Sequence, residues 1–259
     1  MKIAAILLLL CLSALPAQAA VSQADLDSVG VDVKQGAALP LALRFTDDAG
    51  RNRTLGDATD GKPVVLVFAD YTCGNLCGPI LAFAAAGLQK TGLSPGKDFR
   101  LIAIGLDPKD SLDDAREMKR LQIGDMLSHA TVFLTGKPAA IHAATEAAGY
   151  HAVYDREHDQ FAHPGAVFIL APDGRIVRVL SGLGLSGADL RLALVDAGQG
   201  KVGSLLDQIH LRCFGFDAAR GIYTASITRI LALAGAATVT TLLLGMLIMN
   251  LRTRRRVRS

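Results

Sequence analysis

Apolar runs alternate with segments of mixed polarity along the middle of the chain. The runs 64–69 and 99–106 are uninterrupted and aliphatic, which predicts two strands that are buried on both faces. The stretch 80–88 is rich in Leu, Ala and Phe and predicts a helix shortly after the first strand. Further elements are predicted as helices at 111–121, 138–148 and 187–197, and as strands at 41–45, 131–134, 150–154, 166–170 and 176–180.

The order of these elements predicts the fold class. The last two strands flank Pro172-Asp173-Gly174-Arg175, a strong turn sequence. Strands and helices alternate first, and the hairpin and a final helix follow. This order predicts an α/β protein with a thioredoxin-like domain, a central mixed sheet flanked by helices, over residues 39–200. The segment 20–38 is expected to be irregular.

A proline precedes the first strand of the predicted hairpin, in the pair His163-Pro164. In thioredoxin-like folds a cis-proline at this place faces the helix that follows the first buried strand. We therefore take a cis bond before Pro164 as a hypothesis, although most X–Pro bonds are trans. It would bring His163 to the start of that helix. Taken alone, His163 is more simply interpreted as a packed core histidine.

The N-terminal residues 1–19 have the pattern of a signal peptide. Lys2 supplies a positive start, residues 3–12 an apolar core, and Ala17-Gln18-Ala19 a cleavage site of small residues. An uncleaved membrane anchor is the alternative. We expect cleavage, which would also remove Cys11 from the mature protein.

The C-terminal part has the pattern of a membrane anchor. Residues 230–249 contain no charge and are long enough to span a bilayer. Five arginines follow, and the positive-inside rule places them in the cytoplasm. We predict a juxtamembrane segment at 201–228, a transmembrane helix at 229–250 and a basic cytoplasmic tail at 251–259. A buried core helix is the alternative, but such a helix rarely ends in five arginines.

These patterns predict a single-pass protein of the cytoplasmic (inner) membrane, with its main domain on the periplasmic side. The formal net charge of +3 depends on the tail. Without the five arginines the charge is −2, and the loss of Lys2 takes it to −3. The folded part is therefore slightly acidic, and no nucleic-acid partner is indicated.

Two cysteines, Cys73 and Cys77, lie four residues apart where the first buried strand leads into a helix. The N–H groups and the dipole at a helix start favour anionic sulfur. Residues at i and i+4 are neighbours on a helix, so the two sulfurs can form a disulfide or bind one soft metal ion. An inert buried pair or a permanent disulfide is the structural alternative. A disulfide across so short a loop constrains the unfolded chain little.

The mature chain keeps a third cysteine, Cys213. An odd number of cysteines in an exported, usually oxidising compartment argues against a disulfide framework. We favour the interpretation that Cys213 is a small apolar residue in a juxtamembrane packing patch. A resolving thiol, a third sulfur ligand and a crosslink to a partner are the alternatives.

Three separated motifs resemble those of the Sco/SenC family of copper-binding cytochrome c oxidase assembly factors. They are the stretch from Tyr71 through Cys77, the sequence Asp159-Gln160-Phe161-Ala162-His163-Pro164, and the turn at 172–175. The segments 189–195 and 200–204, and Cys213 before Gly221-Ile222-Tyr223, fit the branch of that family with a C-terminal membrane helix. The chain departs from the family in Gly74 and Gly78, where prolines are usual, and in Ala162, where many members have an acidic residue.

The resemblance implies a thioredoxin-like domain that binds one copper ion through Cys73, Cys77 and His163. It also implies delivery of copper to the dinuclear copper centre of cytochrome c oxidase. Two thiolates and an imidazole suit the soft ion Cu(I), with Cu(II) as a second state. The expected partners are the copper-site subunit of the oxidase, a periplasmic copper donor, a thiol reductant and, through residues 229–250, membrane lipid.

We therefore predict a membrane-anchored copper metallochaperone, a carrier rather than an enzyme. The alternative is a periplasmic thiol–disulfide oxidoreductase, in which Cys73 and Cys77 are a redox pair that reduces the cysteines of a copper-site client. A peroxidase-like enzyme is the weakest candidate, because no activating arginine lies beside Cys73 in the sequence. Asp70, three residues before Cys73, is left out of the metal set, since a strand-end aspartate more often caps a turn.

Overall fold

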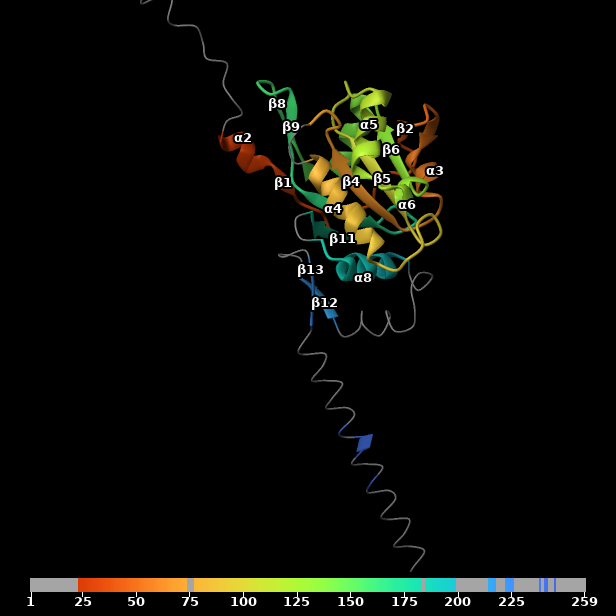
Figure 1. Ribbon diagram of the computed structural model, residues 1–259. Helices are drawn as coiled ribbons and strands as arrows, with labels where there is room; N and C mark the ends of the chain where they lie inside the picture. The colour runs from red at the N-terminus through yellow and green to blue at the C-terminus, as the bar shows by residue number, and fades with distance from the viewer. Residues whose placement is uncertain are drawn as a thin grey trace, which may run out of the picture.

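The computed structural model describes residues 23–73, 77–182, 185–198, 214–217 and 222–225, together with Thr238, Thr240, Thr241 and Gly245 (Figure 1). The predicted signal peptide, the basic tail, Cys213 and most of the predicted transmembrane segment lie outside the described residues. Within the described part of the chain, no helix is both long and apolar enough to cross a membrane. The anchor therefore stays a prediction.

A seven-stranded mixed sheet forms the centre of the domain. In sheet order its strands are β11 (Ile176–Ser181), β10 (Ala166–Leu170), β4 (Val64–Ala69), β5 (Arg100–Gly105), β6 (Thr131–Thr135), β2 (Arg44–Asp47) and β3 (Asn52–Thr54). The three central strands β4, β5 and β6 are parallel, and antiparallel strands flank them on both sides. Every residue of β4 is buried, as its continuous apolar run predicts.

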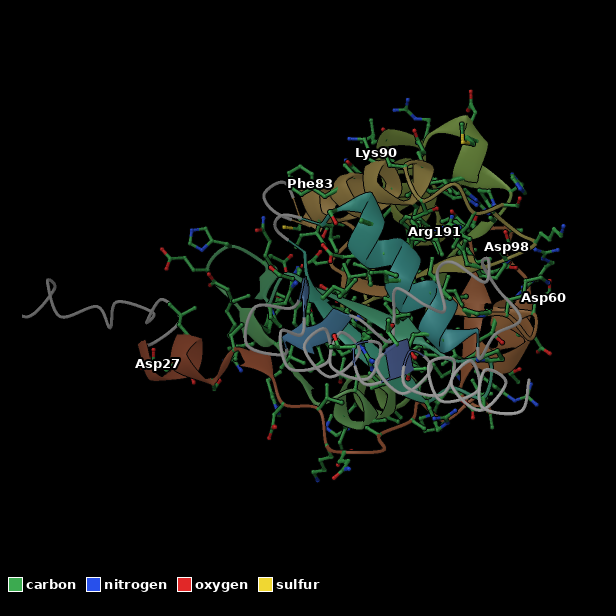
Figure 2. The ribbon with its side chains drawn as sticks, turned by 90° about the horizontal axis from the view of Figure 1, so that it is seen from below. Asp27, Asp60, Phe83, Lys90, Asp98 and Arg191 are labelled. Atoms are coloured by element: carbon green, nitrogen blue, oxygen red, sulfur yellow. The ribbon has the colours of Figure 1, made fainter. Side chains whose placement is uncertain are left out.

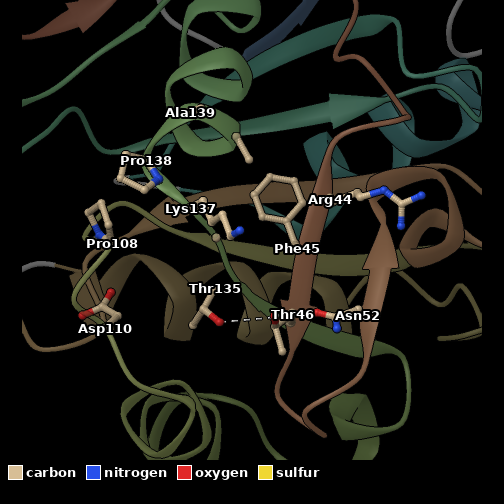
Figure 3. A pocket seen from close by; sticks show the side chains of 12 residues that line it. Arg44, Phe45, Thr46, Asn52, Pro108, Asp110, Thr135, Lys137, Pro138 and Ala139 are labelled. Atoms are coloured by element: carbon tan, nitrogen blue, oxygen red, sulfur yellow. Dashed lines mark hydrogen bonds between the residues drawn. The ribbon is translucent and has the colours of Figure 1, made fainter.

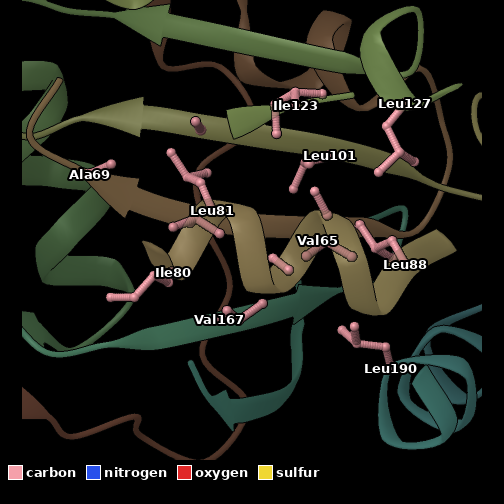
Figure 4. Packing of buried hydrophobic residues seen from close by; sticks show 14 of the residues in the cluster. Val65, Ala69, Ile80, Leu81, Leu88, Leu101, Ile123, Leu127, Val167 and Leu190 are labelled. Carbon is pink, nitrogen blue, oxygen red and sulfur yellow. The ribbon is translucent and has the colours of Figure 1, made fainter. Parts of the chain in front are cut away.

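Helices cover both faces of this sheet (Figure 1). They are α3 (Leu55–Thr59), α4 (Cys77–Gln89), α5 (Leu112–Gln122), α6 (Asp125–Ser128), α7 (Pro138–Ala147) and α8 (Gly187–Ala197). Side chains of a strand alternate between the faces. Val65 and Leu101 pack on one face under α4, α5 and α8 (Figure 4), whereas Val64 and Leu66 pack on the other face against α3 and α7. The predicted arrangement of a central mixed sheet between helices is confirmed.

Helix α4 carries Cys77 as its first residue, packs against the sheet on one face and is bonded to α8 beyond its C-terminal end. Its apolar residues Leu81 and Leu88 face the sheet (Figure 4). Beyond its end, Arg191 of α8 donates a hydrogen bond to the carbonyl oxygen of Thr91, next to Lys90 (Figure 2). The helix is therefore a fixed support for the cysteine at its start.

In the described part of the chain, three two-stranded sheets lie outside the main sheet. They pair β1 (Gly30–Val31) with β7 (Tyr150–His151), β8 (Val153–Asp155) with β9 (Gln160–Ala162), and β12 (Phe214–Asp217) with β13 (Ile222–Ala225). The β8–β9 hairpin projects to one side of the domain (Figure 1). This hairpin leads directly into His163.

The structure differs from the sequence predictions in its short elements and in one peptide bond. The segment 20–38, expected to be irregular, contains α2 (Gln23–Ser28) and β1. The strand expected at 41–45 begins later, as β2. No peptide bond in the described residues is cis, so our hypothesis of a cis bond before Pro164 is wrong. The trans form is intrinsically favoured by about 0.5–1 kcal/mol at X–Pro bonds.

Candidate functional site

The turn between β4 and α4, which carries Cys73, is anchored by Tyr71. This side chain is 5% exposed, and its hydroxyl oxygen lies 3.0 Å from the carbonyl oxygens of both Ala103 and Leu134. The same hydroxyl accepts a hydrogen bond from the backbone N–H of Leu134 at 3.2 Å. The backbone N–H of Tyr71 donates to Oδ2 of Asp110 at 3.1 Å. The turn is thereby fixed to β5 and β6.

Asp70 is fully buried and joins this turn to β9. Its Oδ1 accepts hydrogen bonds from the backbone N–H and the hydroxyl of Thr72, at 3.1 and 3.0 Å. Its Oδ2 accepts the backbone N–H of Phe161 at 3.0 Å. Asp70 therefore caps its own turn, as expected for a strand-end aspartate, and it also holds the hairpin that precedes His163.

Cys73 is a free, half-buried cysteine beside the same hairpin. Its Sγ lies 3.8 Å from Oε1 of Gln160 in β9, within the range of a thiol donating to an oxygen. Cys77 begins α4, but its side chain lies outside the described part of the structure. The distance between the two sulfurs therefore stays untested.

His163 is half-buried and follows β9 directly. Its Nδ1 lies 2.8 Å from the hydroxyl oxygen of Tyr150 and 3.2 Å from the carbonyl oxygen of Pro164. Burial lowers the pKa of His163 below its usual value, against the hydrogen bond to Pro164 and the negative charge of Asp70, which both raise it. The imidazole is therefore neutral at neutral pH, which is the form that binds metals.

The segment after His163 lies against the first turn of α4. A Cβ added at Gly165 would lie 3.2 Å from Cδ1 of Ile80, so the Ile80 side chain would have to shift by a few tenths of an ångström. The carbonyl oxygen of Gly165 also accepts the N–H of Gly182 at 2.6 Å. The structure thus brings together the Cys73 turn, the first turn of α4 and the His163 segment.

The complete ligand set of Cys73, Cys77 and His163 stays a prediction. Among the side chains that the structure describes, no group of three or more His, Cys, Asp or Glu could hold a metal ion. That statement does not include the side chain of Cys77, one of the three predicted ligands. The other described histidines do not join the site, and all are exposed: His129, His142, His151 and His158.

Asp110 is a buried residue near the site that the sequence analysis missed. It is 8% exposed, and its Oδ1 has no hydrogen-bond partner in the described structure. Burial raises the pKa of Asp110 to about 7, the N–H of Tyr71 lowers it, and the charges of Asp70 and Asp107 raise it further. Asp110 also lines a pocket of about 690 Å³ beside Pro108 and Lys137 (Figure 3). Neither Cys73 nor His163 lines this pocket, so it is separate from the site.

Fold and site together define an α/β protein that carries a thiol at its central strand–turn–helix junction and a histidine just before its last hairpin. The family model described as SCO1/SenC matches residues 32–189, and the chain belongs to this family. The family assignment made from the motifs is thereby confirmed. No curated protein matches the sequence significantly.

Solved structures of Sco proteins share the fold. A SCO1/SenC family lipoprotein from Bacillus anthracis is 19% identical, with a TM-score of 0.54 over 66% of this chain and 99% of that chain. Arabidopsis thaliana ScoI with copper bound is 19% identical, with a TM-score of 0.53 over 62% of this chain and 99% of that chain. A proposed electron transfer protein from Aquifex aeolicus VF5 is 23% identical, with a TM-score of 0.56 over 63% of this chain and 94% of that chain. These similarities show the thioredoxin-like fold.

Proposed function

We propose that the protein is a membrane-anchored copper metallochaperone that assists assembly of the copper centre of cytochrome c oxidase. Copper would be bound by Cys73, Cys77 and His163. The observation that carries the proposal is the contact of β9 with the Cys73 turn, made by Asp70 and Gln160, because His163 follows β9 directly. Membership in the SCO1/SenC family and the copper bound by the similar Arabidopsis ScoI support it.

The donor groups at this place suit Cu(I). A thiolate is a soft donor, and a neutral imidazole is a common ligand of copper. Burial keeps the His163 ring neutral, because it lowers the pKa of the imidazole. The thiols must be reduced before copper is loaded, since a disulfide offers no thiolate. A thiol reductant and a periplasmic copper donor therefore belong to the proposed cycle.

The proposed location is the periplasmic face of the cytoplasmic membrane. The signal sequence at 1–19 and the apolar segment at 229–250, followed by arginines, are its sequence basis. The client is the copper-site subunit of the oxidase in the same membrane. A tether would raise the effective concentration of the carrier near that client.

The test is the copper content and X-ray absorption spectrum of the purified, reduced full chain. The proteins are the wild type, His163→Ala and, as a matched control, His151→Ala, which removes an exposed histidine of β7. We expect about one equivalent of Cu(I), held by two sulfurs and one nitrogen, in the wild type and the control. The nitrogen should be absent from His163→Ala.

A reduced wild type that retains no copper after desalting would overturn the proposal. The thiol–disulfide oxidoreductase would then be favoured, because it needs Cys73 and Cys77 but no third ligand. His163→Ala would in that case keep the reductase activity. The reduction potential of the cysteine pair would be the next quantity to measure.

A further inference from the structure

The contacts around His163 favour one of the two neutral tautomers of its ring. Nδ1 lies 3.2 Å from the carbonyl oxygen of Pro164, and a carbonyl oxygen can only accept a hydrogen bond. The hydroxyl of Tyr150 donates its own proton to the same carbonyl at 2.9 Å, so its oxygen faces Nδ1 as an acceptor at 2.8 Å. With the hydroxyl proton directed at Pro164, both contacts are satisfied by a hydrogen on Nδ1, and the ring lone pair then lies on Nε2.

Tyr150 is fixed in the core, which makes its hydroxyl a rigid reference point. The residue is 3% exposed and belongs to β7. Its ring centroid lies 4.7 Å from that of Phe68 and 5.9 Å from that of Phe168, and both of these rings are fully buried. The His163 ring lies at 6.3 Å, tilted by 34°. The contact with Tyr150 therefore fixes the orientation of the His163 ring relative to the sheet.

We infer that Tyr150 is a positioning residue for the copper ligand, which holds His163 as the Nδ1–H tautomer and presents Nε2 to the metal. The metal part of this inference rests on the proposed function, whereas the tautomer is a property of the metal-free protein. A partner on the second nitrogen of a ligating histidine fixes the ring and raises its basicity. Loss of such a partner typically costs about 10- to 100-fold in metal affinity.

Tyr150→Phe removes only the hydroxyl and keeps the ring that packs on Phe68 and Phe168. Nδ1 would then keep the longer of these two contacts, to Pro164. The matched control is Tyr154→Phe, which removes the same atom from β8. The hydroxyl of Tyr154 bonds Asp159 and Lys109 instead of His163.

The first measurement is the ¹⁵N NMR spectrum of the metal-free, reduced full chain, labelled at histidine only and assigned by comparison with His163→Asn. We expect a protonated Nδ1 and an unprotonated Nε2 for His163 in the wild type and in Tyr154→Phe. Tyr150→Phe should show a mixture of both tautomers. A wild-type His163 with its proton on Nε2 would overturn the inference without reference to any variant.

The second measurement is the Cu(I) dissociation constant, from competition with a chromophoric chelator. Tyr150→Phe should bind Cu(I) about 10-fold or more weakly than the wild type, and Tyr154→Phe as the wild type does. Equal affinities and an unchanged tautomer in Tyr150→Phe would reject the positioning role while the copper function stands. A wild type that retains no Cu(I) would reject the copper function and the metal part of this inference, whatever the tautomer.

Discussion

The Cys73 turn and the β8–β9 hairpin meet at the proposed site, but they are stabilised in different ways. The turn belongs to the core, since Asp70 and Tyr71 are buried and bonded to the sheet and the hairpin. The hairpin has only three residues in each strand, all of them half-buried. The cysteine side is therefore rigid, whereas the histidine side is held by a few contacts and can open locally at low cost.

The outer contact of the hairpin is a polar cluster at its surface. The ammonium of Lys109 contacts the carboxylate of Asp159 and lies 2.9 Å from the hydroxyl oxygen of Tyr154. Lys109 and Asp159 are 59% and 70% exposed, and exposed ion pairs contribute little to stability. The inner contacts, from Asp70 and Tyr150, thus position His163, and the outer cluster restrains the hairpin.

The largest contrast between the two sides should come from deleting one aromatic ring on each. Tyr71→Ala removes a buried ring and the acceptor of the Leu134 N–H, so we expect the free energy of unfolding to fall by about 4 kcal/mol. Phe161→Ala removes a half-buried ring of the hairpin and should cost about 1 kcal/mol. Urea unfolding measures both. Equal losses would show that the hairpin is as much part of the core as the turn.

Next in size is the effect of Asp110, which supports the turn through Tyr71. Because burial raises its pKa to about 7, the folded protein binds a proton that the unfolded chain releases near pH 4, and stability falls as the pH rises from about 4 to 7. Asp110→Asn keeps an acceptor for the Tyr71 N–H but carries no charge. We expect it to stabilise the protein by about 4 kcal/mol at pH 8 and hardly at pH 3, where Asp110 is protonated in both the folded and the unfolded state. A gain that is the same at both pH values would contradict this assignment.

The connection between the two sides depends on Asp70. Asp70→Ala removes the acceptor of the Thr72 and Phe161 N–H groups, so unfolding should become easier by about 2 kcal/mol, and the amide of Phe161 should exchange faster. Asp70→Asn keeps one carbonyl oxygen and should lose less. Chemical denaturation and hydrogen exchange report the two effects separately. Unchanged exchange at Phe161 would mean that Asp70 does not hold the hairpin.

The smallest effect is expected at the surface of the hairpin. Lys109→Ala removes the contacts to Asp159 and Tyr154 and the 3.4 Å ion pair with Asp107, and because the ammonium is exposed we expect only a small fall in the free energy of unfolding. Amide exchange in β8 and β9 should nevertheless become faster, because local opening costs less. Arg120→Ala, which removes the exposed pair with Glu117, is the control and should leave the hairpin unchanged. A clear shift of the midpoint by Lys109→Ala would place the hairpin inside the cooperative core.

The long elements were predictable from the sequence because apolar residues recur along their whole length. The apolar run 64–69 became β4 with the expected bounds, and so did the segment 187–197, which became α8 and in which apolar residues recur among polar ones. The short α3 was not predicted, because the capping box of Thr54 and Asp57, and not periodicity, defines its start. In such short elements, tertiary contacts outweigh local pattern.

At the site, the local motifs pointed to Cys73 and His163, but their supporting residues were not predicted. Tyr150 lies thirteen residues before His163, and Gln160 lies far from Cys73 in the sequence. Contacts at such separations leave no periodic signal in one sequence. Asp110 follows a predicted strand end and gave no sign that it would be buried.

The carboxylate of Asp70 makes the two sides of the site thermodynamically linked. Its Oδ1 bonds Thr72, which precedes Cys73, and its Oδ2 bonds Phe161, two residues before His163. Linkage between two sites is reciprocal. A change at the Cys73 turn that weakens the Asp70–Phe161 hydrogen bond should destabilise the hairpin, and opening of the hairpin should destabilise the turn by the same coupling free energy. A partner that binds the hairpin would, by the same relation, stabilise the Cys73 turn without contacting a sulfur atom.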